Sequence, residues 1–321
     1  MAYQHEVRLQ ELAAEPMRPA GPRQGFFHGT FQSIRDVSSR RELLNQLTRR
    51  EIKARYKDSV LGFFWSLAKP LAMLFVYYIA IGKFLGAQRS IPDFAIFIFA
   101  GLTSWQVFSD IVNLGTGSIV GNAALIKKVY VPREVFPLSV VGSSLFNFAI
   151  QLFILIAATA TLGRFPTGDR WLYFALSLAV LVVFATALAF LLSAINVYLR
   201  DVQYLVEILL MILMWASPIV YSWTLVQNAL AGSNGVRPPI YPWIERLYLA
   251  NPMTLVTLGF QKAFWVAGDA QPVSIKNGVL ITPYPPGLGR SLFLMLCISV
   301  VLLWFSQRVF ARLQSNFAQE L

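Results

Sequence analysis

The sequence predicts an all-α integral membrane protein with six transmembrane helices, an N-terminal amphipathic interfacial helix before them, and re-entrant helices in the last outer loop. Of its 321 residues, 56% are hydrophobic and only 13% are charged, whereas a soluble domain carries about 25% charged residues. Continuous apolar runs recur at about the 20 residues that a helix needs to cross a hydrocarbon core of ~30 Å. Because these runs do not alternate with polar residues, they exclude a transmembrane β-barrel.

Residues 1–35 are rich in Pro, Gly, Gln and charged residues and show no sustained period, which predicts a disordered cytoplasmic tail. This part lacks the apolar core of a secretory signal, so the amino terminus is expected in the cytoplasm. It contains the only histidines, His5 and His28, while the only cysteine is Cys297. Because these ligand types do not cluster, we expect no metal site.

A basic amphipathic helix is predicted over residues 36–58. Ser39 is followed three residues later by Glu42, the pattern of a capping box, so a helix should begin near Arg40. Residues spaced four apart share one side of this helix: Leu44, Thr48, Ile52 and Tyr56. The other side carries mostly Lys and Arg, which is typical of a helix lying on a membrane surface. The alternative, a soluble surface helix that leads into a buried core helix, is disfavoured by the apolar composition.

Six apolar runs follow and form the predicted transmembrane domain over residues 59–312. They cover residues 61–85, 94–119, 135–162, 171–197, 204–221 and 292–310. Most of the 27 Lys and Arg residues fall before Val60 or after the second, fourth and sixth runs. Because positively charged loops stay in the cytoplasm, both termini are predicted there, including the C-terminal segment 313–321. The same rule accounts for the net charge of +11 without a nucleic-acid partner.

The long outer loop 222–290 contains an apolar segment, 253–267, that begins after Pro252 and ends before Gly268. About 15 helical residues reach only about 22 Å, which is short of a full crossing. We therefore predict a re-entrant pair, in which 242–250 dips into the membrane and 253–267 returns. Two basic side chains would then reach the outer interface: Arg246 and Lys262. The alternative is a helix that lies flat on the outer surface.

Polar residues form faces on two of the predicted spans. Gln106, Asp110, Asn113 and Gly117 follow one another at spacings that share one helix face, and Asn147 and Gln151 form a similar pair. Such faces should turn inward, either to line a channel or to bond neighbouring helices. The candidate channel-lining residues are Trp105, Gln106, Phe108, Asp110, Asn113, Asn147, Gln151, Trp215 and Tyr221. Asp110 should be neutral, hydrated or paired with a cation such as Lys69.

The loop 124–137 is short and amphipathic and contains Pro132 and Pro137. It is predicted to contact a partner, although an ordinary positively charged inner loop would have a similar composition. The chain contains no phosphate-binding Gly-x-x-x-x-Gly-Lys-Ser/Thr loop, no Gly-x-Ser-x-Gly elbow and no His-Glu-x-x-His pair. We therefore expect no catalytic residue and no cofactor in this chain.

Six motifs occur in order along residues 34–312. They are 50–65 (REIKARYKDSVLGFFW) with Pro70, 101–105 (GLTSW), 125–134 (LIKKVYVPRE), 196–202 (NVYLRDV), 217–221 (SPIVY) and 251–254 (NPMT). With these motifs the chain resembles the permease subunit of type-2 ATP-binding-cassette exporters, specifically those that export O-antigen, capsule or teichoic-acid polymers. Relative to that family, the part before Gln32 and the segment 268–288 resemble extensions.

The resemblance implies a permease homodimer on two copies of a separate ATPase subunit, which would bind ATP and Mg. The substrate would be a polysaccharide linked to a polyprenyl diphosphate, exported across the bacterial cytoplasmic (inner) membrane. This chain would be a transport subunit in contact with membrane lipid. The helix 36–58 and the coupling loop 124–137 are then expected to contact the ATPase, and the candidate coupling residues are Arg50, Arg55, Tyr56, Lys127, Lys128, Tyr130, Arg133 and Glu134.

Two other functions compete with this one. A type-2 exporter of a drug or small lipid belongs to the same class. A membrane-bound glycan transferase is a different class, and it requires acids and bases at the place where substrate arrives. The predicted outer face offers only scattered carboxylates: Asp93, Asp169, Glu245 and Asp269.

Overall fold

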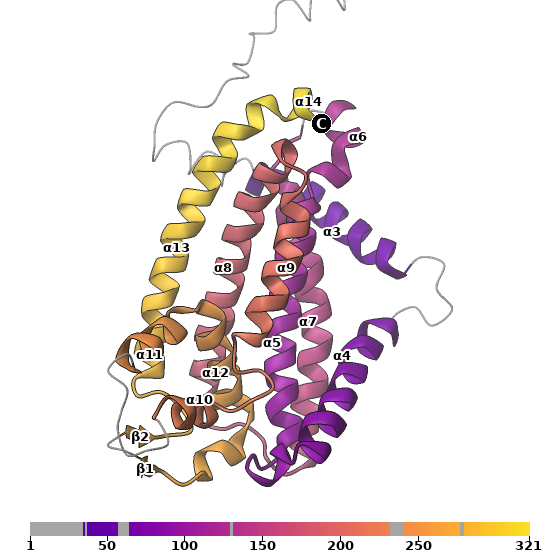
Figure 1. Cartoon of the computed structure of the whole chain (residues 1–321). Helices are drawn as coiled ribbons and strands as arrows, with labels where there is room; N and C mark the ends of the chain where they lie inside the picture. The colour runs from indigo at the N-terminus through magenta and orange to yellow at the C-terminus, as the bar shows by residue number, and fades with distance from the viewer. Residues whose placement is uncertain (1–34, 36, 57–63, 129–130, 232–240, 277–278) are drawn as a thin grey trace, which may run out of the picture.

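The computed structural model describes residues 35, 37–56, 64–128, 131–231, 241–276 and 279–321 (Figure 1). Four long helices form its body: α5 (Phe94–Gly117), α7 (Val135–Thr161), α8 (Arg170–Tyr198) and α13 (Leu288–Leu313). The shorter helices are α3 (Arg41–Tyr56), α4 (Phe64–Tyr77), α6 (Ala123–Lys128), α9 (Val202–Trp215), α10 (Trp223–Leu230), α11 (Tyr241–Ala250), α12 (Pro252–Phe264) and α14 (Phe317–Glu320). The described chain is thus mostly helical, as predicted.

Several helices are apolar enough for a membrane. By length and composition, four of the described helices can cross one: Phe94–Gly117, Val135–Thr161, Arg170–Tyr198 and Leu288–Glu320. Of two shorter apolar helices, Pro70–Phe84 falls within the first predicted span and Val202–Trp215 overlaps the fifth. In the first of these, α4 continues into a π-helical segment, Tyr78–Phe84.

The fifth predicted span, 204–221, is shorter than expected. Helix α9 has 14 residues and ends at Trp215, which gives a length of about 21 Å at ~1.5 Å per residue. Pro218 explains the early end, because proline has no N–H to donate and disfavours a helical conformation at the residue before it. The residues from Ser217 to Tyr221 are therefore irregular.

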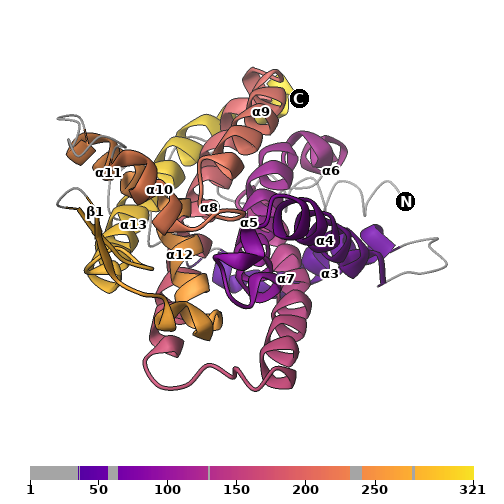
Figure 2. The same cartoon turned by 60° about the horizontal axis from the view of Figure 1, so that its bottom comes forward.

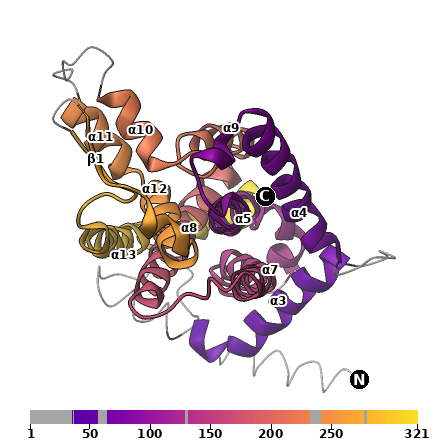
Figure 3. The same cartoon turned by 90° about the horizontal axis from the view of Figure 1, so that it is seen from below.

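Helix α5 lies at the centre of the bundle, as Figure 3 shows from below. It contacts α4, α7, α8, α9 and α12, and it is apolar on most sides, which is typical of a buried helix. Gly115 allows the close approach of α8, since a Cβ atom at this position would lie 2.6 Å from the Cβ of Ala189. Small residues at such crossings let helix backbones pack closely in membrane proteins.

One end of the bundle carries α3, α6 and α14, and we call it the α6 end (Figure 1). Helix α3 begins at Arg41, next to the predicted start at Arg40, and packs against α7. Leu47 is buried, and a Cβ atom on Gly142 of α7 would lie 3.0 Å from Cγ2 of Thr48. The Thr48 hydroxyl donates to the carbonyl oxygen of Leu44 at 2.8 Å. The side of α3 that carries Leu44 and Thr48 therefore faces the bundle. Arg49 and Arg50 of the same helix are exposed.

The opposite end, which we call the α12 end, gathers α10, α11, α12 and a small hairpin (Figure 2). Helix α12 begins where predicted, because Asn251 caps it by accepting a hydrogen bond from the Met253 N–H at 2.9 Å and Pro252 occupies its first turn. It ends at Phe264, and a 3-10 helix, Val266–Ala270, follows.

The hairpin corrects the all-α prediction within the segment 268–288. Strand β1 (Ser274–Lys276) pairs antiparallel with β2 (Val279–Ile281), with Ser274 opposite Ile281. A sequence signal existed, because Asn277-Gly278 between two β-branched stretches is a strong indicator of a tight hairpin. The prediction overlooked it because each strand has only three residues.

Candidate functional site

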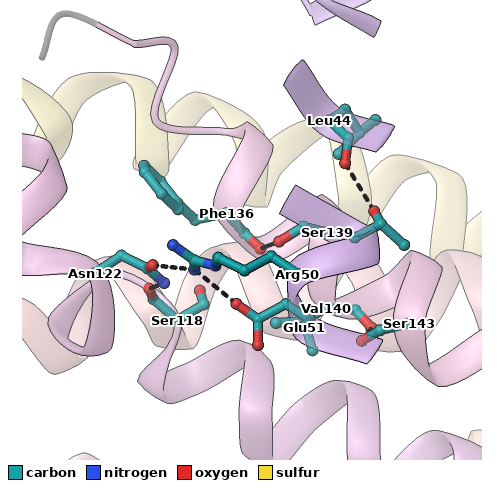
Figure 4. A network of polar contacts seen from close by, with 10 residues as sticks. Leu44, Arg50, Glu51, Ser118, Asn122, Phe136, Ser139, Val140 and Ser143 are labelled. Atoms are coloured by element: carbon teal, nitrogen blue, oxygen red, sulfur yellow. Dashed lines mark hydrogen bonds and ion pairs between the residues drawn. The ribbon is translucent and has the colours of Figure 1, made fainter. Parts of the chain in front are cut away.

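The two elements predicted to contact a partner meet at the α6 end. The Arg50 guanidinium donates hydrogen bonds to Oδ1 of Asn122 and, at 2.8 Å, to Oε1 of Glu51 (Figure 4). Asn122 closes the 3-10 helix Val120–Asn122, directly before α6, and its own Nδ2 donates to the Ser118 carbonyl oxygen at 2.8 Å. Arg50 therefore connects α3 to the beginning of α6.

An apolar cluster lies behind this connection and joins α3, α6, α7, α8, α13 and α14. Its buried members are Leu47, Ile119, Ile126, Val135, Phe136, Phe190, Ala194, Val197, Phe310 and Phe317. Ile126 anchors α6 in the cluster, and the neighbouring Lys127 and Lys128 remain exposed. These lysines end α6, where positive charge interacts favourably with the helix dipole. Helix α6 therefore presents a basic surface while its apolar side is held in the cluster.

The other predicted coupling residues differ in their surroundings. The guanidinium carbon of Arg133 lies 5.8 Å from the centroid of the Phe317 ring, in a cation–π contact. Arg55 and Tyr56 belong to α3, but their side chains are not described, and Tyr130 lies outside the described residues.

Glu134 was predicted to contact the partner from the surface, and the structure places it elsewhere. Its side chain is buried, directly before the first turn of α7. There it interacts electrostatically with Arg308 of α13. The Glu134 carboxylate is thus covered by this chain, whereas Lys127 and Lys128 remain exposed.

The polar face predicted on α5 points partly toward α9. Gln106 Nε2 donates to Oδ1 of Asp110 at 2.8 Å, and Asn113 bonds to the side chain of Gln203 on α9. A Cβ atom at Gly117 would lie 3.4 Å from Oε1 of the same Gln203. Asp110 thus has a polar neighbour one turn away, and the side chain of Lys69, its predicted cation, is not described.

The aromatic candidates for a channel lining separate into two groups. Trp105 and Phe108 are buried in the core, and the Phe108 ring stacks on Phe184 of α8 with centroids 5.9 Å apart. In contrast, Trp215 at the end of α9 is 54% exposed. The Tyr221 hydroxyl donates to the Trp215 carbonyl oxygen at 2.8 Å, so the structure brings these two candidates together. Phe108 and Trp105 therefore form no accessible surface within one chain.

Asn147 and Gln151 of α7 are also buried. Oε1 of Gln151 finds no hydrogen-bond donor among the residues that the structure describes. Both side chains are covered within one chain, so neither lines an accessible surface there, and the choice between channel lining and bonding of neighbouring helices stays a prediction.

Sequence reasoning missed a charged cluster at the α12 end. Arg170, buried at the start of α8, donates to the carbonyl oxygen of Lys262 at 2.6 Å and pairs with Asp269. The Lys262 ammonium pairs with the same carboxylate at 2.5 Å and lies 4.9 Å from the centroid of the Tyr284 ring. Burial, with the nearby charge of Asp269, raises the pKa of Tyr284. The cluster ties α12 and the segment after it to α8.

This cluster gives Lys262 a partner within the chain, and whether it also reaches the outer interface stays a prediction. No spacing rule indicated it, because Arg170 and Asp269 are 99 residues apart. Arg246 of α11, by contrast, is exposed, and its guanidinium carbon lies 5.6 Å from the centroid of the exposed Trp243 ring.

Comparison with known proteins adds the family context. Residues 42–265 match the family described as ABC-2 type transporter. The chain is 31% identical, over 90% of its length, to the O-antigen export system permease protein RfbA of Myxococcus xanthus, of which 98% is covered. It is 31% identical to RfbA of Klebsiella pneumoniae over 65% of this chain and 86% of that protein. Polysialic acid transport protein KpsM of Escherichia coli is more distant, at 23% over 54% of this chain and 67% of that protein.

Proposed function

This chain belongs to the ABC-2 type transporter family, and we propose that it is the membrane permease of an exporter of lipid-linked polysaccharide, driven by ATP hydrolysis in a separate subunit. Relatives with this role are named for the export of O-antigen and for the transport of polysialic acid. The observation that carries the proposal is the family match, which covers α3, α6 and the polar face of α5 in one stretch. The chain itself is a transport subunit and not an enzyme.

The ATPase subunit docks at the α6 end in this proposal. Arg50 and Asn122 connect α3 to α6, and the apolar cluster behind them holds both on the bundle. Exposed ion pairs contribute only about 0–1 kcal/mol each. The charges of Lys127 and Lys128 would therefore set the orientation of the partner more than its affinity.

The transmembrane arrangement in this proposal has six crossings, with both termini in the cytoplasm of a bacterial cell and the membrane being the inner one. The four long helices supply four of these crossings. Helix α4 with its π-helical extension supplies the fifth, and helix α9 supplies the sixth. Helix α12 has 13 residues, or about 20 Å, and is too short to cross. Its residues from Met253 to Gln261 are all buried, and it packs against α5 and α8. This burial supports a re-entrant helix over one that lies flat on the surface.

The exposed face of α9 supports a homodimer of the permease, and we propose one ATPase subunit on each copy. Its strongly exposed apolar residues are Tyr204, Leu205, Ile208, Leu209, Met211, Ile212 and Trp215. Glu207 is exposed on the same short helix, and an acidic side chain that faces lipid is costly. A second copy that packs on the α9 side would shield Glu207 from lipid and enclose a polar path between the two chains.

Fewer residues can then line the polysaccharide path than the sequence suggested. The candidates with accessible surface are Gln106, Asp110, Asn113, Trp215 and Tyr221. Amides and carboxylates can bond sugar hydroxyls, and the exposed Trp215 offers a flat ring face for a pyranose. The polyprenyl diphosphate would stay on the lipid side of this path.

The transferase alternative loses two of its four candidate carboxylates. Asp93 pairs with Arg164 at 3.5 Å, and Asp269 pairs with both Arg170 and Lys262. Both carboxylates are thus engaged with cations of this chain and are not free to act on an arriving substrate.

The decisive experiment uses inverted membrane vesicles that contain this chain and its ATPase subunit. We expect lipid-linked polysaccharide to enter the vesicles only with ATP, and cells without this chain to retain the polymer inside. Vesicles that move a drug or a short lipid but no polymer would support the other type-2 exporter class. Polymer elongation by the purified chain alone would support a transferase.

A further inference from the structure

The segment after α13 ends beside α6. The 3-10 helix Gln314–Asn316 and helix α14 follow α13 directly, and α14 contacts both α6 and α8. Figure 1 shows α14 beside α6 at the same end of the bundle. Helix α14 has only four residues, and a helix of that length is not stable without tertiary contacts. A specific contact must therefore hold it in place.

That contact is the side chain of Phe317. It is fully buried, whereas the three residues that follow it are exposed. Its ring meets Phe310 of α13 edge to face, with centroids 5.5 Å apart, and Tyr198 of α8 at 6.3 Å. The Tyr198 hydroxyl donates to the Leu313 carbonyl oxygen at 2.9 Å, which fixes the end of α13 at the same place.

The same ring also faces the coupling loop. Arg133, in the turn between α6 and α7, places its guanidinium carbon 5.8 Å from the Phe317 centroid. Ile126 of α6 belongs to the apolar cluster that contains Phe317. Phe317 is thus one residue at which the coupling loop, α8 and α13 come together, although α8 and α13 do not adjoin the loop along the chain.

We propose that Phe317 is a positioning residue for coupling. It acts as a wedge that sets the position of Arg133 and α6 relative to α8 and α13, so that a displacement of the loop by the ATPase moves these two helices as well. Without the ring, the loop would lose the link from Arg133 through Phe317 to α8 and α13. Only the rest of the apolar cluster and the interaction of Glu134 with Arg308 would still join the loop to these two helices. The proposal rests on the proposed function and adds a specific route from the ATPase to α8 and α13.

The test measures coupling and assembly separately in the complete complex. Phe317→Ala removes the ring, and Phe317→Leu keeps an apolar side chain but removes the cation–π contact with Arg133. Phe305→Ala is the matched control, because Phe305 lies on α13 and is exposed. For each variant, the readouts are the amount of ATPase subunit that copurifies, the ATP hydrolysis rate, and the polysaccharide exported per ATP.

We expect Phe317→Ala to copurify with a normal amount of ATPase subunit but to export about five-fold less polysaccharide per ATP. Phe317→Leu should fall between this variant and the wild type, and Phe305→Ala should match the wild type. If Phe317→Ala reduces the amount of permease, the export per ATP of Phe317→Leu is used to test the proposal instead.

Unchanged export per ATP in Phe317→Ala, or in Phe317→Leu where the alanine variant is poorly produced, would overturn the proposal. A fall in total export that only follows the protein amount would not support it, because a purely structural role changes only the amount of complex. If the wild-type complex itself exported no polysaccharide, the proposed function would fail instead.

Discussion

Arg50 of α3 and Asn122, which lie 72 residues apart, share a hydrogen bond that joins the helix at the bundle surface to the beginning of α6. Neither element has a sequence that fixes its position by itself, because α3 is polar and α6 is short. Helix α6 has six residues, and isolated helices below about 12–15 residues are marginal in water. Together with the apolar cluster behind it, the bond sets how the two basic surfaces are presented.

Replacing Asn122 tests this connection. Asn122→Ala removes the acceptor, and the loss of stability should be small, about 0.5–1.5 kcal/mol, because a typical hydrogen bond contributes that much and Arg50 is half exposed. We expect a larger effect on function, with export per ATP reduced about two- to five-fold. Asn122→Asp keeps an acceptor for Arg50 and should retain most of the activity. Equal losses in both variants would contradict a role for the bond.

Replacing Asp269 tests the charged cluster at the α12 end. Asp269→Ala leaves the buried Arg170 without its carboxylate, and we expect a loss of about 1–3 kcal/mol, less than for a fully buried pair because Asp269 is 41% exposed. Asp93→Ala is the matched control, since its partner Arg164 is exposed, and it should cost at most about 1 kcal/mol. Thermal unfolding in detergent provides the comparison. If both variants unfolded at the same temperature, the cluster would not hold α12.

Two aromatic residues should respond in opposite ways. Phe108→Ala creates a cavity in the core and should destabilise the protein by about 3–5 kcal/mol, with a lower amount in the membrane. Trp215→Ala removes an exposed ring and should leave the amount unchanged but reduce export. Quantified membrane protein and surface polysaccharide give both values. Normal export by Trp215→Ala at a normal protein level would remove this residue from the proposed path.

The proposed topology places the α6 end and the hairpin on opposite sides of the membrane. Single cysteines at Lys127 and Val273, both exposed, in a Cys297→Ser background should react with a membrane-impermeant thiol reagent from opposite sides. Val273 should be labelled in intact spheroplasts, and Lys127 only in inverted vesicles. Labelling of both positions from one side would show that the number of crossings between them is even, against the proposed arrangement.

Much of the helical framework follows from local sequence. A continuous apolar run of sufficient length must be a helix in a bilayer, because only a helix satisfies its own backbone hydrogen bonds there. The beginning of α12 at Asn251 and Pro252 follows equally from local chemistry. The family could also be recognised from short motifs such as those around Arg50 and Asn251, and the family match agrees with it.

The partners of individual side chains could not be predicted in the same way. Gln106 and Phe108 are two residues apart on α5, yet Phe108 stacks on α8 and Gln106 bonds Asp110 on a partly exposed face. Glu134 and Lys128 are both charged residues of the predicted coupling loop, but only Glu134 is buried.

The sequence by itself therefore determined the long apolar helices and the family to which the chain is similar, but not the β1–β2 hairpin or the early end of α9. Only the tertiary structure decided that Arg170 meets Asp269 and that Phe317 meets Arg133. The physical reason is that helix formation and membrane insertion depend on neighbours within a few turns, whereas these pairs depend on how helices pack. Packing brings together residues that no periodicity relates.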